Sequence, residues 1–207
     1  LAAQTDLDVE SAPYWLVIQR GFLGAGYDYA TTHVSGFAFE AGERAHASTV
    51  SLNEGAVISD RASFDAYVWP DPAAADCSSL DEAAATLVAG MKLVVPGPGG
   101  VLENVIRLVG YEPLCLMIID DEQLAFDIFE QVGSRLTEMY KRTAPHPAVG
   151  ACISNDDWGF NTQTMLSPAD MRRFVFPWHE RIVKVIHGAG KPAILHSCGY
   201  YGEVIED

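Results

Sequence analysis

The second half of the chain alternates short apolar runs with longer patterns of helical period. The runs Met91–Val95, Ala148–Ser154 and Pro192–Leu195 have the length and composition of buried parallel strands. In the stretch 124–139, apolar residues instead recur every three or four positions, which predicts an amphipathic helix. Strands that alternate with helices are typical of a parallel β/α architecture. The sequence therefore predicts an α/β fold of the TIM-like (β/α)8 barrel type.

The predicted barrel is incomplete at its C-terminus. A closed eight-stranded barrel usually needs about 250 residues, whereas this chain has 207. Tyr14–Ile18 is a candidate strand in the N-terminal part. We expect an N-terminal segment of unclear structure at 1–60 and a partial barrel at 61–207. The natural protein is expected to continue past Asp207 with further β/α units, and residues 1–207 alone are expected to aggregate or to associate through an open sheet edge.

Helix signals also mark the C-terminal part of the chain. Ser167 is a favourable N-cap residue, and Pro168 suits the first position of a helix. The apolar stripe that follows extends to Gly188, and Pro177 is expected to kink this helix. A further helix is expected to begin near Tyr201.

The charge balance argues against several classes of partner. The chain has 28 acidic and 13 basic side chains, and its formal net charge is −15 at pH 7. Nucleic acids and anionic membranes bind clusters of Lys and Arg, so neither is expected as a partner. No apolar run reaches the roughly 18 residues of a membrane span. The four cysteines are widely spaced, which favours a reducing compartment over a disulfide framework. We expect a cytoplasmic protein with a small-molecule substrate, and its oligomeric state stays open.

His196 and Cys198 form the sharpest candidate site. They lie two residues apart at the end of an apolar run, so both side chains are expected on the same face of a strand. Active sites of β/α barrels lie at the C-terminal ends of the strands. An imidazole nitrogen and a thiolate sulfur suit zinc, which needs at least one more ligand. The alternative is a buried histidine beside an inert, hydrophobic cysteine.

Asp156 and Asp157 follow the preceding predicted strand and are candidate catalytic residues. Adjacent side chains at a strand end face opposite ways, so one carboxylate is expected to enter the barrel mouth. There it would act as a base, a metal ligand or a group that orients the substrate. The alternative is that both residues cap a loop. Glu103 and Asn104, near the start of a predicted helix at Leu102–Val109, either line the same mouth or cap that helix.

Two histidines in the C-terminal helical pattern have a simpler interpretation. His179 and His187 both lie within the amphipathic stretch that follows Ser167. We expect surface or packing roles for them rather than ligand roles.

Several motifs together resemble one known family. They are, in order, Asn155-Asp-Asp-Trp-Gly-Phe160, Leu166-Ser-Pro-Ala-Asp-Met171, Phe176-Pro-Trp-His179, Ile186-His-Gly-Ala-Gly-Lys-Pro192 and Leu195-His-Ser-Cys-Gly199. Their order and spacing over roughly residues 90–207 are similar to the uroporphyrinogen decarboxylase-like superfamily. The His-x-Cys pair places the resemblance closer to its methyltransferase branch.

The resemblance implies one of two chemistries. The methyltransferases hold zinc with a His-x-Cys pair and a later Cys, and use it to activate a thiol that exchanges a methyl group with a corrinoid. His196 and Cys198 match that pair, whereas the later Cys has no counterpart in this chain. Zinc is then the expected cofactor, and a corrinoid protein is a candidate partner.

The decarboxylases act on a porphyrinogen without a cofactor, with an Asp that stabilises the protonated pyrrole intermediate. Their Arg-Gln-Ala-Gly-Arg hallmark matches only Gln19-Arg20-Gly21 here. Because an octa-acidic porphyrinogen needs several basic groups, 13 Lys and Arg in the whole chain favour the methyltransferase. A relative that only binds a ligand or a corrinoid protein is the third hypothesis. A methyltransferase should bind zinc, and a decarboxylase should bind no zinc but should protect a porphyrinogen analogue. A binding relative should do neither and should only capture a partner.

Overall fold

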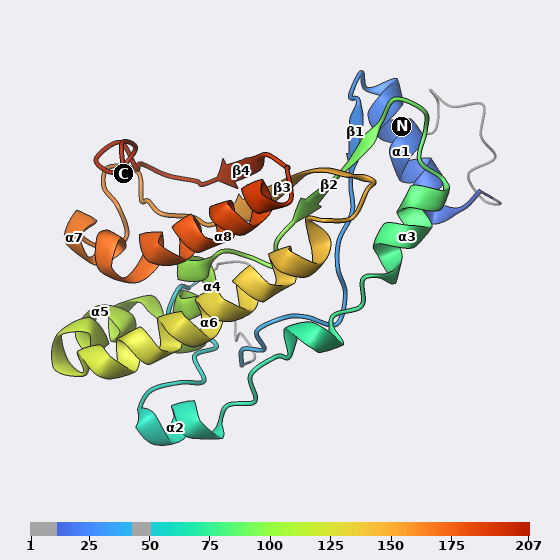
Figure 1. Cartoon of the computed structure of the whole chain (residues 1–207). Helices are drawn as coiled ribbons and strands as arrows, with labels where there is room; N and C mark the ends of the chain where they lie inside the picture. The colour runs from blue at the N-terminus through green and yellow to red at the C-terminus, as the bar shows by residue number, and fades with distance from the viewer. Residues whose placement is uncertain (1–11, 43–50) are drawn as a thin grey trace.

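Four parallel strands form a single sheet in the computed structural model, which describes residues 12–42 and 51–207 (Figure 1). The strands are β1 (Tyr29–Thr31), β2 (Lys92–Pro96), β3 (Val149–Asn155) and β4 (Ala193–His196). Each strand pairs with the next one along the chain, in the order β1-β2-β3-β4. The predicted α/β class and the parallel pairing are confirmed, and the arrangement is consistent with a TIM-like fold.

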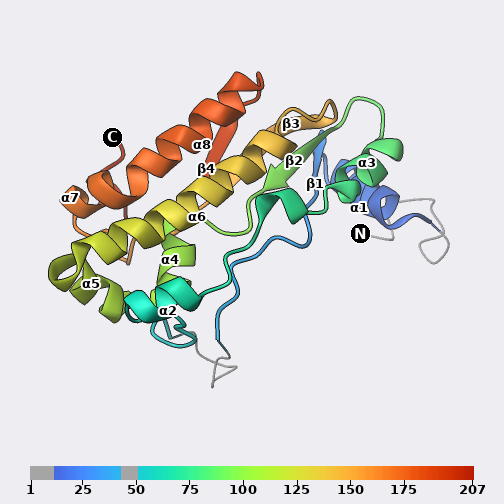
Figure 2. The ribbon, with the colours of Figure 1, turned by 60° about the horizontal axis from the view of Figure 1, so that its bottom comes forward.

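Helices connect the strands and pack beside them. They are α1 (Tyr14–Gly24), α2 (Arg61–Ala66), α3 (Ser78–Ala85), α4 (Val101–Val109), α5 (Tyr111–Asp120), α6 (Glu122–Thr143), α7 (Pro168–Asp170) and α8 (Phe176–Gly188). The two long helices α6 and α8 lie side by side, as both views of the ribbon show (Figures 1 and 2). None of the helices in the described residues has the length and apolarity needed to cross a membrane.

The core forms where the apolar stripe of α6 meets α8 and the sheet. Leu124, Ile128 and Leu136 recur at helical spacing and are all buried. Gly133 allows α6 to approach α8 closely, because a Cβ atom there would lie 2.1 Å from the ring of Trp178. The apolar face that the sequence predicts for α6 therefore packs against α8. This contact positions α8 and the chain that leads from it into β4.

Helix α4 begins directly behind the C-terminal end of β2. The Glu103 carboxylate accepts a hydrogen bond from the Gly100 amide at 3.1 Å, which satisfies a backbone donor at the start of the helix. The helix ends at Gly110, whose φ of 88° lies in a region that favours glycine. This geometry places the first turn of α4 at the same edge of the sheet as the end of β3.

The expected strand at Tyr14–Ile18 is wrong, because these residues begin α1. Their aromatic and β-branched composition is typical of strands, but positions four apart are the ones that become buried. Trp15 and Gln19 both face inward, and Gln19 Nε2 donates a hydrogen bond to the carbonyl of Ala83 at 2.7 Å. Packing against α3 therefore decides the local structure.

One expectation in the C-terminal part also needs correction. The chain from Tyr201 forms turns rather than a helix. The kink expected at Pro177 stays a prediction, because the helical stretch runs from Pro168 to Gly188 and Pro177 lies inside it, in the first turn of α8. A π-helical turn lies just before it, at Met171–Val175.

The two outer strands of the sheet, β1 and β4, can be compared with the expected division at residue 60 and the expected open sheet edge. Residues 29–31, which lie before the expected division at residue 60, pair with β2, and that division stays a prediction. At the other edge, Ile194 and Leu195 of β4 are 44% and 43% exposed. Among the described residues, no strand pairs with the outer side of β4, and the aggregation expected for 1–207 stays a prediction.

Candidate metal centre

The pairing of β3 with β4 brings two predicted sites together. Asn155 ends β3, His196 ends β4, and the two residues are partners in the register of the sheet. The pairing continues one step further, because the Asp156 amide donates a hydrogen bond to the His196 carbonyl at 2.9 Å. The residues that follow each strand therefore leave the sheet side by side.

The two turns beyond the strands are in backbone contact. The Trp158 amide donates to the Ser197 hydroxyl at 3.0 Å. A Cβ atom on Gly199 would lie 1.9 Å from the Gly159 carbonyl oxygen, so only glycine fits there. Gly199 also has a φ of 78°, which a side chain would strain. The glycine that follows the His-x-Cys pair is thus required by a close approach between the loops.

Asp157, His196 and Cys198 converge at this edge of the sheet. One potential ligand atom from each residue lies within 4.8 Å of the other two. Cys198 Sγ and His196 Nε2 are 3.6 Å apart, so the two side chains meet, as their spacing predicts. His196 and Cys198 are exposed, whereas Asp157 is half-buried. A ligand can therefore reach the group of three, named here the Asp-His-Cys triad, from solvent.

The Asp-His-Cys triad has the donor atoms that zinc requires, and the distance between two of them fits a zinc site. Thiolate sulfur, imidazole nitrogen and carboxylate oxygen are its usual protein ligands. A tetrahedral site with the usual Zn–S and Zn–N bond lengths separates these two atoms by about 3.5 Å. The observed distance between Cys198 Sγ and His196 Nε2 agrees with that value. Three protein ligands would leave the fourth position open, as in catalytic zinc sites.

The electrostatic surroundings of Cys198 are unfavourable for a free nucleophile. A hydrogen bond to the Asp157 carboxylate and the negative charge of that group raise the pKa of the Cys198 thiol, with smaller contributions from desolvation and from Glu103. Nucleophilic cysteines have the opposite surroundings, in which positive groups lower the thiol pKa. The same negative groups favour a bound cation, so the site suits a metal ligand better than a cysteine nucleophile.

Asp156 faces away from the triad and is fully buried. Its carboxylate accepts hydrogen bonds from the Leu102 amide at 3.1 Å, the Glu103 amide at 3.0 Å and the Trp158 indole at 3.1 Å, and His179 Nε2 lies 2.7 Å away. It therefore joins the end of β3 to the first turn of α4 and to α8. His179 is thus buried and in polar contact with Asp156, rather than on the surface.

Two features of α4 make a buried carboxylate acceptable at this place. The free amides of the first helical turn point at Asp156, and the helix dipole favours negative charge there. Gly100 leaves the necessary room, because a Cβ atom on it would lie 2.1 Å from the Cβ atom of Asp156. Asp156 thus fixes the position of its neighbour Asp157 without reaching the solvent-accessible site itself.

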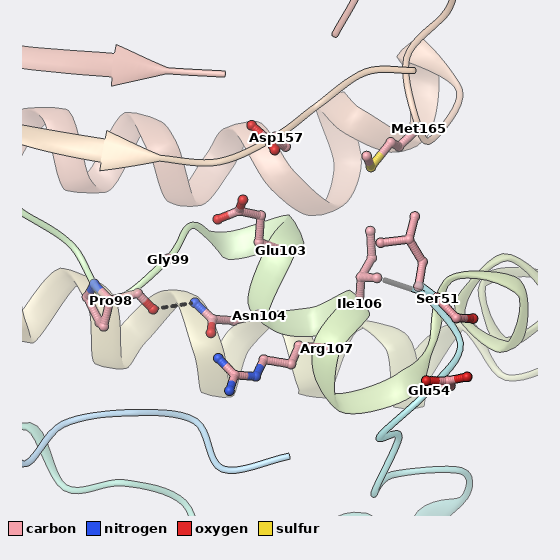
Figure 3. A pocket seen from close by; sticks show the side chains of 11 residues that line it. Ser51, Glu54, Pro98, Gly99, Glu103, Asn104, Ile106, Arg107, Asp157 and Met165 are labelled. Carbon is pink, nitrogen blue, oxygen red and sulfur yellow. Dashed lines mark hydrogen bonds between the residues drawn. The ribbon is translucent and has the colours of Figure 1, made fainter. Parts of the chain in front are cut away.

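A cavity of about 340 Å³ adjoins the triad and shares Asp157 with it (Figure 3). Its lining comes from the end of β3, from α4 and from the chain around residue 52: Ser51, Leu52, Glu54, Pro98, Gly99, Glu103, Asn104, Ile106, Arg107, Asp157 and Met165. The carboxylates of Glu103 and Asp157 point toward each other (Figure 3). Burial raises the pKa of Glu103, and the charges of Asp156 and Asp157 raise it further, against the lowering effect of its bonds to backbone amides.

The sequence matches the profile of the uroporphyrinogen decarboxylase (URO-D) family over residues 53–207. The chain belongs to the URO-D family. A comparison with curated proteins returned no match. The superfamily that the motifs resemble is therefore confirmed, and its members are mostly enzymes. The matched range includes β2, β3 and β4 and all three residues of the triad.

The URO-D chain brings together most, but not all, of its predicted site residues. His196, Cys198 and Asp157 converge, whereas Asp156 lies in the core. Glu103 combines both of its expected roles, since it caps α4 and lines the cavity. Arg107, a basic residue that lines the cavity, was not predicted from the sequence. Its position four residues after Glu103 is a usable signal, because such residues lie on the same side of a helix.

Proposed function

We propose that this URO-D family chain is a zinc-dependent methyltransferase that moves a methyl group between a corrinoid and a thiol or similar acceptor. The observation that carries the proposal is the Asp-His-Cys triad, whose ligand atoms lie within 4.8 Å of one another. The proposal includes a TIM-like barrel, to which the parallel sheet contributes four strands. A corrinoid protein is the proposed partner, and the cytoplasm is the proposed location.

In this proposal, His196, Cys198 and Asp157 hold the zinc ion. Bound zinc lowers the pKa of a thiol and so makes the thiolate available at neutral pH. Asp157 has a second task, since one of its oxygens accepts a hydrogen bond from the Cys198 amide at 2.6 Å and holds the His-x-Cys turn in place. Asp156 acts through the backbone by fixing the end of β3.

The methyl transfer balances with these components. The thiol releases its proton, and its sulfur forms a bond to the methyl carbon. The bond between that carbon and the corrinoid breaks, and the corrinoid keeps the electron pair. The cavity beside the triad is the proposed place for the thiol.

The charges in the cavity support this function over decarboxylation of a porphyrinogen. Among the described residues that line the cavity, Glu54, Glu103 and Asp157 are acidic and Arg107 is basic. A substrate with many carboxylates would be repelled by such a surface. The composition of the cavity therefore agrees with the low content of Lys and Arg in the whole chain.

Metal analysis of the purified protein tests the proposal. Elemental analysis by mass spectrometry should find about one zinc per chain, and His196→Ala or Cys198→Ala should remove it. His187→Ala and Cys77→Ala are matched controls, because they remove the same groups from positions outside the triad, and both should retain the metal. Circular dichroism should show that all four variants stay folded.

A protein that binds no zinc, or that binds it equally well in the triad variants, would contradict the proposal. Activity can be followed with methylcobalamin and a thiol, from the change in corrinoid absorbance on demethylation. Cys198→Ala should abolish this change while the far-UV spectrum stays native. Zinc bound without any methyl transfer to thiols would favour the relative that only binds a ligand.

A further inference from the structure

Glu103 is a half-buried carboxylate that faces a second carboxylate and forms no ion pair with a side chain in the described part of the chain. Its side chain points into the cavity toward Asp157, from the first turn of α4 (Figure 3). Among the residues that the structure describes, no Lys, Arg or His side chain forms an ion pair with it. Burial and the nearby acidic groups raise the free energy of its charged form. A cationic group bound in the cavity would lower that free energy.

Asn104 offers a second acceptor in the same cavity. Its side chain is buried, with 3% of the residue exposed. Both protons of its amide nitrogen are used, because Nδ2 donates to the Pro98 carbonyl at 3.2 Å and to the Gly100 carbonyl at 2.7 Å. These two bonds fix the orientation of the amide, so its Oδ1 is presented as an acceptor. No side chain or amide in the described part of the chain donates to this oxygen.

Among the described residues, the cavity therefore combines a carboxylate that forms no ion pair and a fixed amide acceptor, on consecutive residues of one helix. A ligand that satisfies both acceptors must donate a hydrogen bond to each of them and carry positive charge beside Glu103. A primary ammonium group has three donors and meets this requirement, whereas a hydroxyl or a carboxylate does not.

We propose that Glu103 and Asn104 make this site selective for a small thiol that carries a protonated amine. The inference rests on the proposed function, in which the thiol binds at the Asp-His-Cys triad. Asp157 belongs to both the triad and the cavity, so the amine and the sulfur must be separated by a short chain. A cavity of about 340 Å³ is at the small end of ligand sites and has room for such a molecule.

The ligand charge that remains after metal binding supports the same conclusion. The Cys198 thiolate and the Asp157 carboxylate together balance the two charges of a zinc ion. Glu103 is a separate carboxylate beside them, and no described Lys, Arg or His side chain forms an ion pair with it. It is therefore available as the counterion of an ammonium group on the substrate.

Thiol binding to the Co²⁺-loaded protein tests this inference without an activity measurement. Cobalt accepts the same ligands as zinc, and its absorption changes when a thiolate binds. Three probes differ in charge: cysteamine is cationic, 2-mercaptoethanol is neutral and 3-mercaptopropionate is anionic. Each is titrated against the natural protein, against Glu103→Gln, and against Glu130→Gln, which removes an exposed charge on α6 away from the cavity.

The Glu103→Gln variant should discriminate between the probes. The glutamine oxygen can still accept the bond from the Gly100 amide, so the start of α4 is preserved. The dissociation constant of cysteamine should rise about tenfold, while that of 2-mercaptoethanol should change by less than about twofold. The anionic thiol should bind more tightly than before, and Glu130→Gln should behave as the natural protein does.

Two failures of the experiment have different meanings. If Co²⁺ binds and Glu103→Gln changes the binding of all three thiols equally, the selectivity is wrong while the metal site stands. If Co²⁺ does not bind to the natural protein, or binds equally after His196→Ala, the proposed function itself is wrong and the inference fails with it.

Discussion

The Asp157 carboxylate accepts a hydrogen bond from the backbone amide of Cys198 at a distance of 2.6 Å. This bond joins the turn after β3 to the turn after β4, and it leaves the second carboxylate oxygen available to a metal ion. Asp157 is therefore both a candidate ligand and the group that orients the cysteine beside it. Substitutions can separate these two roles.

Asp157→Asn should weaken metal binding while it preserves the fold. The amide oxygen can still accept the bond from Cys198, but the negative charge is lost. We expect the zinc dissociation constant to rise by about 10- to 100-fold, as for groups that support a metal site. Asp157→Ala removes the bond as well and should weaken binding more. Competition with a chromogenic chelator measures both constants, and equal affinity in all three proteins would show that Asp157 is no ligand.

Asp156→Asn should destabilise the protein strongly. The buried carboxylate accepts three hydrogen bonds, whereas an amide places two donors among groups that are themselves donors. Breaking a buried charged network in this way costs about 3–5 kcal/mol in the free energy of unfolding. Urea denaturation followed by tryptophan fluorescence measures the loss. Asp157→Asn is the matched control, and a similar small loss in both variants would contradict the structural role of Asp156.

Cys198 should react slowly with alkylating reagents in the metal-free protein. The Asp157 carboxylate raises the pKa of this exposed thiol, so a smaller fraction is thiolate at any given pH. After chelator treatment, the pH midpoint of alkylation by iodoacetamide should lie above that of an ordinary cysteine. Asp157→Asn and Glu103→Gln should both shift the midpoint downward. Peptide mass spectrometry assigns the modified residue, and a midpoint below the ordinary value would contradict the electrostatic argument.

Gly133→Ala should disrupt the contact between α6 and α8. A Cβ atom at this position would lie 2.1 Å from the Trp178 ring, so one of the two helices must shift. Overpacking of this kind usually costs about 1–3 kcal/mol. Gly188→Ala, at the end of α8, is the control, because no atom lies within 4 Å of its Cβ position. Thermal unfolding should show a large loss for the first variant and little change for the second.

The regular part of the fold could be predicted from the sequence. The strand expected at Ala148–Ser154 is β3 at Val149–Asn155, and the helix expected at Leu102–Val109 is α4 at Val101–Val109. Short apolar runs and helical periods are local signals that survive tertiary packing. The segment Tyr14–Ile18 carried a misleading local signal, because its helix depends on contacts with α3, far away in the sequence.

The site could be predicted only in part. The two-residue spacing of His196 and Cys198 identifies one pair of ligands, because strand alternation is a local property. The third candidate, Asp157, depends on the register between β3 and β4, which pairs Asn155 with His196. Nor does the sequence distinguish Asp156 from Asp157, since the difference arises from which of them meets the first turn of α4.

The close approach of Gly159 and Gly199 has a consequence for how a metal ion would be bound. Because these turns are held by the sheet register and by mutual backbone contact, folding has already restricted the motion of the ligand residues. Little conformational entropy is then left to lose when an ion arrives, and affinity is gained without new contacts. A bulkier residue at either glycine would separate the two loops. The ligand residues would then have to be ordered when an ion binds, and the affinity would be lower.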